Sequence, residues 1–263
     1  MYYKEFCPHH LLRDLVQCYF VCTNDTGGVT EDKVYAAGCV ELLFNTGEPQ
    51  QIQHGNIISK PNVQLWGQTI EPFHFTSSGK HCMFGIRFFP HTAACFFKEP
   101  LNQFNNQVLD FTDFGGKELY ARLAEATLLE KRMALADAFL LKRFTFSGEK
   151  VRLVNNIIDD LSKEDFFENI HSVASRYGMS PRHLQTIFLQ YTGITPKLFH
   201  KITRFQKSLQ LVASGCLSLT SVAYQCGYFD QAHFNKDFKF FTGSTPSHFL
   251  PASSTDFVAT HKN

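Results

Sequence analysis

The chain has 263 residues, of which 44% are hydrophobic, so it is long enough for two ordinary domains with a sizeable core. Its net charge of +1, taken over the whole chain, gives no support for a nucleic-acid partner. The charges are unevenly divided, however. Residues 1–169 hold 16 Lys and Arg against 21 Asp and Glu, a net of −5, whereas residues 170–250 hold 8 against 2, a net of +6. A basic segment behind an acidic one predicts two functions on one chain, with the basic part facing an anion.

The cysteines and the chain start bear on location and metal binding. No basic and apolar leader opens the chain, and no apolar run reaches the roughly 20 residues of a membrane helix. We therefore expect a cytoplasmic protein with no membrane partner and with its eight cysteines reduced. Cys18-x3-Cys22 lacks the second pair of a four-ligand zinc site, and the cluster Cys7–His10 fits a short frayed terminus better than a metal site. No metal and no other cofactor is predicted.

The first third of the chain shows the pattern of a β-rich domain. A short helix is expected around His10–Val16, then a strand over Cys18–Thr23 and a surface turn over residues 24–32. From Val34 to Pro90, short apolar runs separated by Gly, Pro, Asn and Ser predict a barrel or sandwich. The clearest runs are VELLF (40–44), VQLWG (63–67), FHFTS (73–77) and MFGIRFF (83–89).

Helical spacing follows the strands and sets the expected domain boundary. The apolar residues that share a helical face are Leu119, Leu123 and Ala126 in one segment and Leu135, Phe139 and Leu140 in the next. The stretch TFSGEK (145–150) is the expected boundary, after which a helix resumes at about Val151 and ends near Ser162. We predict a sensory or dimerisation domain over residues 1–148, an all-helical domain over 149–251 and a polar tail over 252–263.

Residues 170–250 contain an internal repeat. In the first copy, Gly178 can end a short helix, and Ser180 with Pro181 can start the next as N-cap and first helical residue. This second helix has a buried stripe at helical spacing, and it ends at Gly193. The stripe consists of Leu184, Ile187, Phe188 and Tyr191. A long helix then begins at Thr195-Pro196 and is stopped by Gly215.

The second copy repeats each of these devices. Val222-Ala223 matches Val173-Ala174 at an offset of 49, and Asp230 replaces Ser180 as the cap at an offset of 50, so the later turn is one residue longer. The remaining matches at the offset of 50 are Phe234 to Leu184, Phe238 to Phe188, Gly243 to Gly193 and Thr245-Pro246 to Thr195-Pro196.

A helix, a glycine turn and a second capped helix make a helix-turn-helix, whose second helix, the recognition helix, enters the DNA major groove. The residues that face away from the buried stripes are the candidate base readers. They are Arg182, Gln185, Thr186 and Gln190 in the first copy, and Gln231, Ala232, Asn235, Lys236 and Lys239 in the second. Arg and Lys suit guanine, Gln and Asn suit adenine, and small apolar groups suit the thymine methyl. Lys197, Lys201 and Lys239 are better placed to hold phosphates. An ordinary helical bundle with a solvated face is the alternative, which two matched copies and the net charge of +6 disfavour.

GYFDQAHFNKDFKFFTGSTPSHF (227–249) resembles the C-terminal signature of the AraC/XylS family of bacterial transcription regulators, and VASRYGMSPRHLQTIF (173–188) resembles that family's first helix-turn-helix. The resemblance covers about residues 149–250. It implies a seven-helix domain that places two recognition helices in successive major grooves on one face of DNA. It also implies base contacts for Arg182, Gln185 and Thr186 in the first helix and for Gln231, Ala232, Asn235 and Lys236 in the second. Thr186 stands where many members carry Arg, which implies a weaker or different first reader.

The segments GCVELLFNTGEP (38–49) and CMFGIRFFPHTAACFFKEPL (82–101) resemble a β-rich domain fused to this type of DNA-binding domain. In the better-known relatives this domain is a cupin-like barrel that binds a small effector or mediates dimerisation. Glu41 and Arg87 lie in apolar runs, where a charge near the core needs a partner. Each could anchor a ligand, and the alternatives are that they face outward or pair with each other. With Trp66 they form a candidate effector pocket, and an ordinary core is the alternative.

The sequence thus predicts an α+β protein of two domains: a cupin-like barrel or sandwich followed by helices, then an all-α domain with two helix-turn-helix motifs joined by a long helix. We expect a sequence-specific regulator of transcription that binds double-stranded DNA and has no catalytic residues, since no nucleophile elbow, phosphate loop or dinucleotide fingerprint is present. RNA polymerase, a small effector and a second copy of the chain are further candidate partners. A metal- or thiol-dependent sensor or enzyme in the N-terminal domain is the alternative function.

Overall fold

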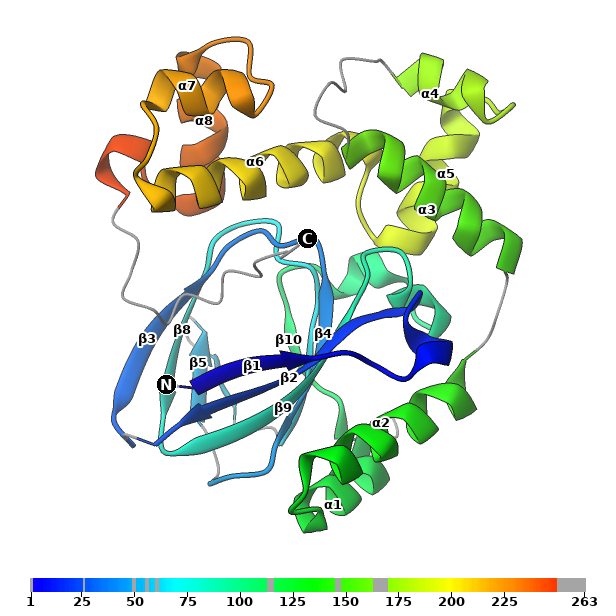
Figure 1. Ribbon diagram of the computed structural model, residues 1–263, viewed down its shortest axis with the longest axis vertical. Coiled ribbons are helices and arrows are strands. Elements are labelled where there is room, and N and C mark those ends of the chain that lie inside the picture. Colours follow the sequence, from blue (N-terminus) through cyan, green and yellow to red (C-terminus); the bar gives the residue numbers. More distant parts are fainter. Residues whose placement is uncertain are drawn as a thin grey trace.

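The computed structural model describes residues 2–25, 27–48, 51–54, 57–59, 62–112, 116–144, 148–162 and 170–249. Strands come first and helices follow, which confirms the α+β prediction (Figure 1). The strands are β1 (Tyr2–Phe6), β2 (Val16–Asn24), β3 (Val29–Val34), β4 (Val40–Asn45), β5 (Gln51–His54), β6 (Ile57–Ser59), β7 (Val63–Trp66), β8 (Phe73–Ser78), β9 (His81–Phe88) and β10 (Val108–Asp110). The predicted tail at 252–263 lies outside the described residues.

The strands form two antiparallel sheets. We call these sheets, together with the loops and 3-10 helices between their strands up to β10, the strand-rich part. The larger has the order β1-β2-β9-β4-β7-β10 and the smaller the order β3-β8-β5-β6. Side chains alternate along β9, so that Phe84, Ile86 and Phe88 join the main core on one face of the larger sheet. Met83 joins a second, smaller core on the other face. There the ring of Phe20 packs where a side chain of residue 85 would stand, which only Gly85 permits.

Two sequence expectations in this part are wrong. Residues 24–32 were expected to be a turn, but β3 begins at Val29 and pairs with β8 from Val29↔Ser78 to Val34↔Phe73. The chain start was expected to be frayed, but β1 pairs with β2 from Tyr2↔Thr23 to Phe6↔Tyr19. Both are edge strands with a single neighbour, held by backbone hydrogen bonds, so neither needs the apolar alternation by which strands are detected.

The helices follow the predicted boundaries closely. They are α1 (Gly116–Glu125), α2 (Leu129–Arg143), α3 (Gly148–Ser162), α4 (Ile170–Arg176), α5 (Pro181–Thr192), α6 (Pro196–Ser214), α7 (Leu219–Gln225) and α8 (Gln231–Thr242). Short 3-10 helices are η1 (His10–Leu12), η2 (Ala93–Cys95), η3 (Leu101–Phe104) and η5 (Pro246–His248). The helix expected around His10–Val16 is only the single turn η1, because β2 already begins at Val16. None of the helices in the described ranges combines the length and hydrophobicity that crossing a bilayer requires.

Helix α6 lies across one end of the strand-rich part, with α4 and α5 at one of its ends and α7 and α8 at the other (Figure 1). Its 19 residues span about 28 Å at 1.5 Å per residue. Side chains of the strand-rich part bind backbone carbonyls of the helices: Gln68 donates to Thr192 O, and Asn105 Nδ2 donates to Gly193 O at 2.8 Å. In the opposite direction, Gln206 of α6 donates to Ala36 O. The two parts are thus joined by specific contacts just before the start of the joining helix and at its middle.

Candidate DNA-binding interface

The first helix-turn-helix consists of α4, a turn and α5. Gly178 adopts the left-handed φ of +64° that ends α4, and the Ser180 hydroxyl accepts from His183 N at 3.2 Å to cap α5. Asp160 of α3 accepts hydrogen bonds from Arg176 Nη1 at 2.6 Å and from the Tyr177 hydroxyl at 2.8 Å. Burial, followed by this bond to Asp160, raises the pKa of Tyr177 to about 12, so the hydroxyl remains a donor at neutral pH. These contacts hold α4 and the turn on α3.

The four residues predicted to read DNA from α5 are all exposed, while the stripe on the opposite face is buried. They are Arg182, Gln185, Thr186 and Gln190. The Thr186 hydroxyl donates to Arg182 O at 2.9 Å within the helix. Thr186 can therefore still offer a base its methyl group and an acceptor oxygen, and the methyl group suits the methyl of thymine.

The second helix-turn-helix consists of α7, a longer turn and α8. Asp230 Oδ1 accepts from His233 N at 2.7 Å and caps α8. Of the predicted readers, Ala232, Lys236 and Lys239 are exposed, whereas Gln231 and Asn235 are half-buried. Gln231 Oε1 accepts from the Thr220 hydroxyl at 2.8 Å, so α7 orients the first side chain of the recognition helix.

An ion-pair network joins α8 to α6. Asp237, only 4% exposed, accepts from Lys201 Nζ at 3.0 Å and from Arg204 Nη2 at 2.8 Å. The Arg204 guanidinium also lies 4.0 Å from the ring centroid of Tyr228. Lys201, which was predicted to hold a phosphate, thus has a carboxylate partner for one of its three ammonium N–H donors. Lys197 and Lys239 are exposed, as a phosphate contact requires.

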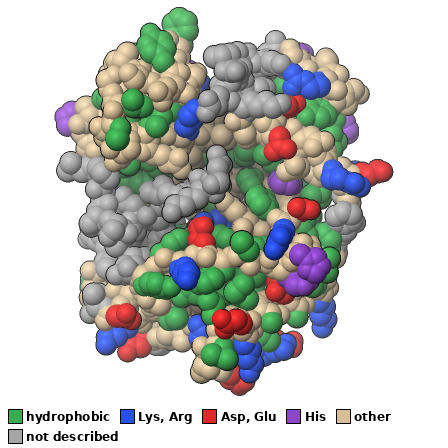
Figure 2. Space-filling model, in the orientation of Figure 1, with side chains coloured by type: hydrophobic (Ala, Val, Ile, Leu, Met, Phe, Trp, Pro, Cys, Tyr) green, Lys and Arg blue, Asp and Glu red, His purple; other side chains and the backbone are tan. Residues whose placement is uncertain are grey.

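Exposed aromatic side chains flank the second recognition helix, and sequence reasoning missed them. Figure 2 shows hydrophobic groups projecting from the surface in the region of α7. Phe229 is 87% exposed directly before the cap of α8, and Tyr224 of α7 is 66% exposed. In the first copy the turn carries Met179, which packs against the core. The extra residue in the later turn was the signal that could have drawn attention to Phe229.

The three residues predicted for an effector pocket lie in one row across neighbouring strands of the larger sheet. Glu41 on β4 faces Trp66 on β7 and Arg87 on β9. Of the alternatives left open, the structure shows pairing: Arg87 Nε donates to Glu41 Oε1 at 2.6 Å, and Arg87 Nη1 donates to Glu5 Oε1 at 2.9 Å. Arg87, at 3% side-chain exposure, thus has two carboxylate partners, and its burial needs no ligand.

No group of three or more His, Cys, Asp and Glu within the described ranges is arranged to hold a metal ion. Cys226, which takes the place of Tyr177 in the repeat, is 5% exposed. This burial fits a packing role better than a reactive thiol, which needs access to solvent.

Comparisons with known proteins divide the chain in two. Residues 4–110 match the family described as "Domain of unknown function (DUF6597)", and residues 173–252 match the family described as "Helix-turn-helix domain". The chain is similar to the HTH-type transcriptional activator RhaS of Escherichia coli O139:H28, with 26% identity over 115 residues. These residues cover 44% of this chain and 41% of RhaS, so the chain spans less than half the length of the curated relatives it matches.

Two solved structures also align with the chain. ToxT from Vibrio cholerae is 12% identical with a TM-score of 0.45, covering 86% of this chain and 96% of ToxT. The C-terminal domain of the two-component response regulator yesN from Fusobacterium nucleatum is 23% identical with a TM-score of 0.34, covering 38% of this chain and 96% of that domain. The family match and the two capped copies joined by α6 agree on the same residues. The C-terminal part of this chain is therefore a double helix-turn-helix domain of the AraC/XylS type.

Proposed function

We propose that the chain is a sequence-specific, DNA-binding regulator of transcription, with its DNA-binding domain over residues 149–251 and a regulatory domain over residues 1–148. The observation that carries the proposal is the pair of capped helices α5 and α8, each with a buried stripe and a polar outer face, at the two ends of α6. A joining helix of about 28 Å is comparable to the roughly 34 Å between successive major grooves on one side of DNA.

The proposed division of labour follows the side chains. In α5, Arg182 and Gln185 supply hydrogen bonds to base edges, and Thr186 supplies a methyl contact. In α8, Gln231 and Asn235 donate to base acceptors from their amide nitrogens, because Gln231 Oε1 accepts from Thr220 and Asn235 Oδ1 is buried. Ala232 contacts a thymine methyl and Lys236 donates to guanine. Gln190 lies at the end of the α5 reading face. Lys197 and Lys239 hold phosphates, and we add Phe229 as an apolar contact.

We propose that the strand-rich part regulates DNA binding. An anionic effector at the row of Glu41, Trp66 and Arg87 would take the place of Glu5 as a carboxylate partner of Arg87. Glu5 is the partner that is more easily displaced, because its side chain is 34% exposed and that of Glu41 is 14% exposed.

RNA polymerase and a second copy of the chain are the further partners of the proposal. The similarity to a protein named a transcriptional activator supports regulation over enzymatic activity. A DNA-binding role also places the chain in the cytoplasm.

The test is selection of a randomised DNA library by the full chain at near-physiological salt, followed by sequencing. The expected result is a motif in two parts, about one helical turn of DNA apart. Arg182→Ala should relax base preference in one part only, at a cost of about 1–3 kcal/mol, and leave the other part unchanged. Bulk binding that depends on salt but enriches no sequence would show that the repeat is a basic scaffold and not a reader.

A further inference from the structure

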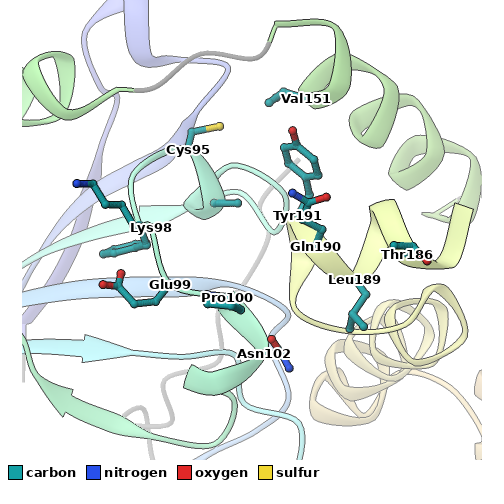
Figure 3. A pocket seen from close by; sticks show the side chains of 12 residues that line it. Cys95, Lys98, Glu99, Pro100, Asn102, Val151, Thr186, Leu189, Gln190 and Tyr191 are labelled. Carbon is teal, nitrogen blue, oxygen red and sulfur yellow. The ribbon is translucent and has the colours of Figure 1, made fainter. Parts of the chain in front are cut away.

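A pocket of about 520 Å³ lies between the strand-rich part and the first recognition helix, α5 (Figure 3). One wall is formed by residues 94–102, which include η2 and the start of η3. The other wall is formed by α5 and by Val151 of α3. The volume is in the range of sites that bind small organic molecules.

The floor of the pocket is apolar and its charged residues lie on the rim. Cys95, Phe97 and Val151 are between 3% and 8% exposed, while Lys98 and Glu99 are exposed neighbours of opposite sign. A charged group placed against this floor would lose its hydration without gaining a counter-ion. The pocket therefore favours an uncharged occupant.

One polar group that lines the pocket can donate a hydrogen bond to a bound molecule. The Tyr191 hydroxyl has no hydrogen-bond partner among the described residues, although the residue is only 9% exposed. Figure 3 shows this hydroxyl and the Cys95 sulfur pointing into the upper part of the pocket, below Val151. The hydroxyl oxygen itself is reached by solvent through the pocket, so a bound molecule can take the place of water there.

The internal repeat provides a comparison within the same chain. The equivalent of Tyr191 in α8, at the offset of 50, is Phe241, which is fully buried and packs on Phe205 with ring centroids 4.7 Å apart. A helix-turn-helix of this design thus has no need of a hydroxyl at this position. The hydroxyl occurs only in the copy whose recognition helix lines this pocket.

The walls of the pocket are held in place by contacts at the end of α5. Asn105 Nδ2 donates to Gly193 O at 2.8 Å, and a side-chain carbon at Gly193 would lie 3.0 Å from Leu101. The equivalent Gly243 has no atom within 4 Å of such a carbon. The first copy is therefore fitted closely to the strand-rich part, and the pocket is formed without a ligand.

We propose that this pocket binds a small, uncharged, largely apolar organic molecule that accepts a hydrogen bond from the Tyr191 hydroxyl. Thr186 and Gln190 line the same pocket from the proposed reading face of α5. A bound molecule that contacts these side chains weakens the docking of α5 into DNA. This last consequence rests on the proposed function, whereas the site itself does not.

The test of the site uses the full chain and the neutral dye 6-propionyl-2-(dimethylamino)naphthalene, whose ketone oxygen can accept a hydrogen bond and whose emission moves to shorter wavelength in apolar surroundings. We expect saturable binding of one dye per chain. Tyr191→Phe, which gives the first copy the residue of the second, should weaken binding about fivefold through the loss of one hydrogen bond. Ala94→Trp, which fills the pocket, should abolish it. Leu128→Ala, which removes an exposed leucine elsewhere, controls for adsorption and should change nothing.

No saturable binding, or binding that both Ala94→Trp and Tyr191→Phe leave unchanged, would overturn the site. The coupling is tested by measuring the affinity of the full chain for its selected DNA with saturating dye, where a loss of at least about fivefold is expected. An unchanged DNA affinity would overturn the coupling. A chain that binds dye at this site but selects no DNA sequence would retain the pocket and lose the proposed function.

Discussion

The hydroxyl of Thr220 on α7 donates a hydrogen bond of 2.8 Å to Oε1 of Gln231, the first residue of α8. In this arrangement the oxygen of the Gln231 amide faces α7 and its Nε2 is left to donate. An amide held in this way loses less side-chain entropy on binding a base than a freely rotating one. If Gln231 reads a base as proposed, Thr220 supports that reading by holding the Gln231 amide.

The first prediction concerns this pair. Thr220→Val keeps the shape of the side chain but removes the donor, so preference at the base read by Gln231 should weaken by about 1 kcal/mol. Thr220→Ser keeps the hydroxyl and should keep the preference. Both are measured by library selection with the full chain. Equal base preference in the Val and Ser variants would remove Thr220 from the reading mechanism.

The second prediction concerns Thr186, whose hydroxyl is used within α5. If its methyl group reads thymine, Thr186→Val should keep the preference at that base pair. Thr186→Ser should lower it by about 1 kcal/mol, roughly the value of one buried methyl group. Competition binding with thymine replaced by uracil at that position provides the matched control, because the missing methyl should then make all three proteins alike. A loss caused by Val and not by Ser would assign the reading to the hydroxyl.

The third prediction concerns the network around Asp237. Asp237→Ala leaves Lys201 and Arg204 without their carboxylate and should lower the free energy of unfolding by about 2–3 kcal/mol. The value is below that of a fully buried pair because the Lys201 side chain is 36% exposed. Urea unfolding measures it, with Glu125→Ala, an exposed acid of α1, as the control that should stay within about 0.5 kcal/mol of the parent. Equal losses in the two variants would mean that the network adds no stability.

The fourth prediction concerns pH. His91 is 4% exposed, and burial lowers its pKa to about 4. Between about pH 6.5 and pH 4 the unfolded chain therefore binds a proton at His91 that the folded chain excludes, so stability falls as the pH is lowered through this window. The slope due to this one group is at most about 1.4 kcal/mol per pH unit. His91→Gln should lose that part of the slope in urea unfolding measured across the window. Parallel curves for the two proteins would show that His91 does not titrate in this way.

The helix-turn-helix repeat could be predicted nearly residue by residue because its signals are local. Ser180, Thr195 and Asp230 cap the helices as expected, and Gly193 and Gly215 adopt the left-handed conformation that ends them. Such devices depend on a few neighbouring residues, so a single sequence reveals them.

The contacts between the two parts of the chain could not be predicted in this way. Their acceptors are the backbone carbonyls of Ala36, Thr192 and Gly193, which every residue possesses, so no residue type marks them. The pairing of Lys201 with Asp237 likewise joins residues 36 positions apart, and sequence shows only that both are charged. The exposed predicted readers, by contrast, follow from the same periodicity that placed the buried stripe.

The two recognition helices sit on one chain, at opposite ends of α6, and carry different outward residues. Symmetric dimers read palindromes, because a two-fold axis makes the two half-sites equivalent. Under the proposed function no such equivalence exists: the base sequence contacted by α5 differs from that contacted by α8, and the polypeptide fixes the order of the two along the DNA. The proposed operator of a single chain is therefore asymmetric and has a direction. Inverting the operator sequence would place the strand-rich part on the other flank of the gene.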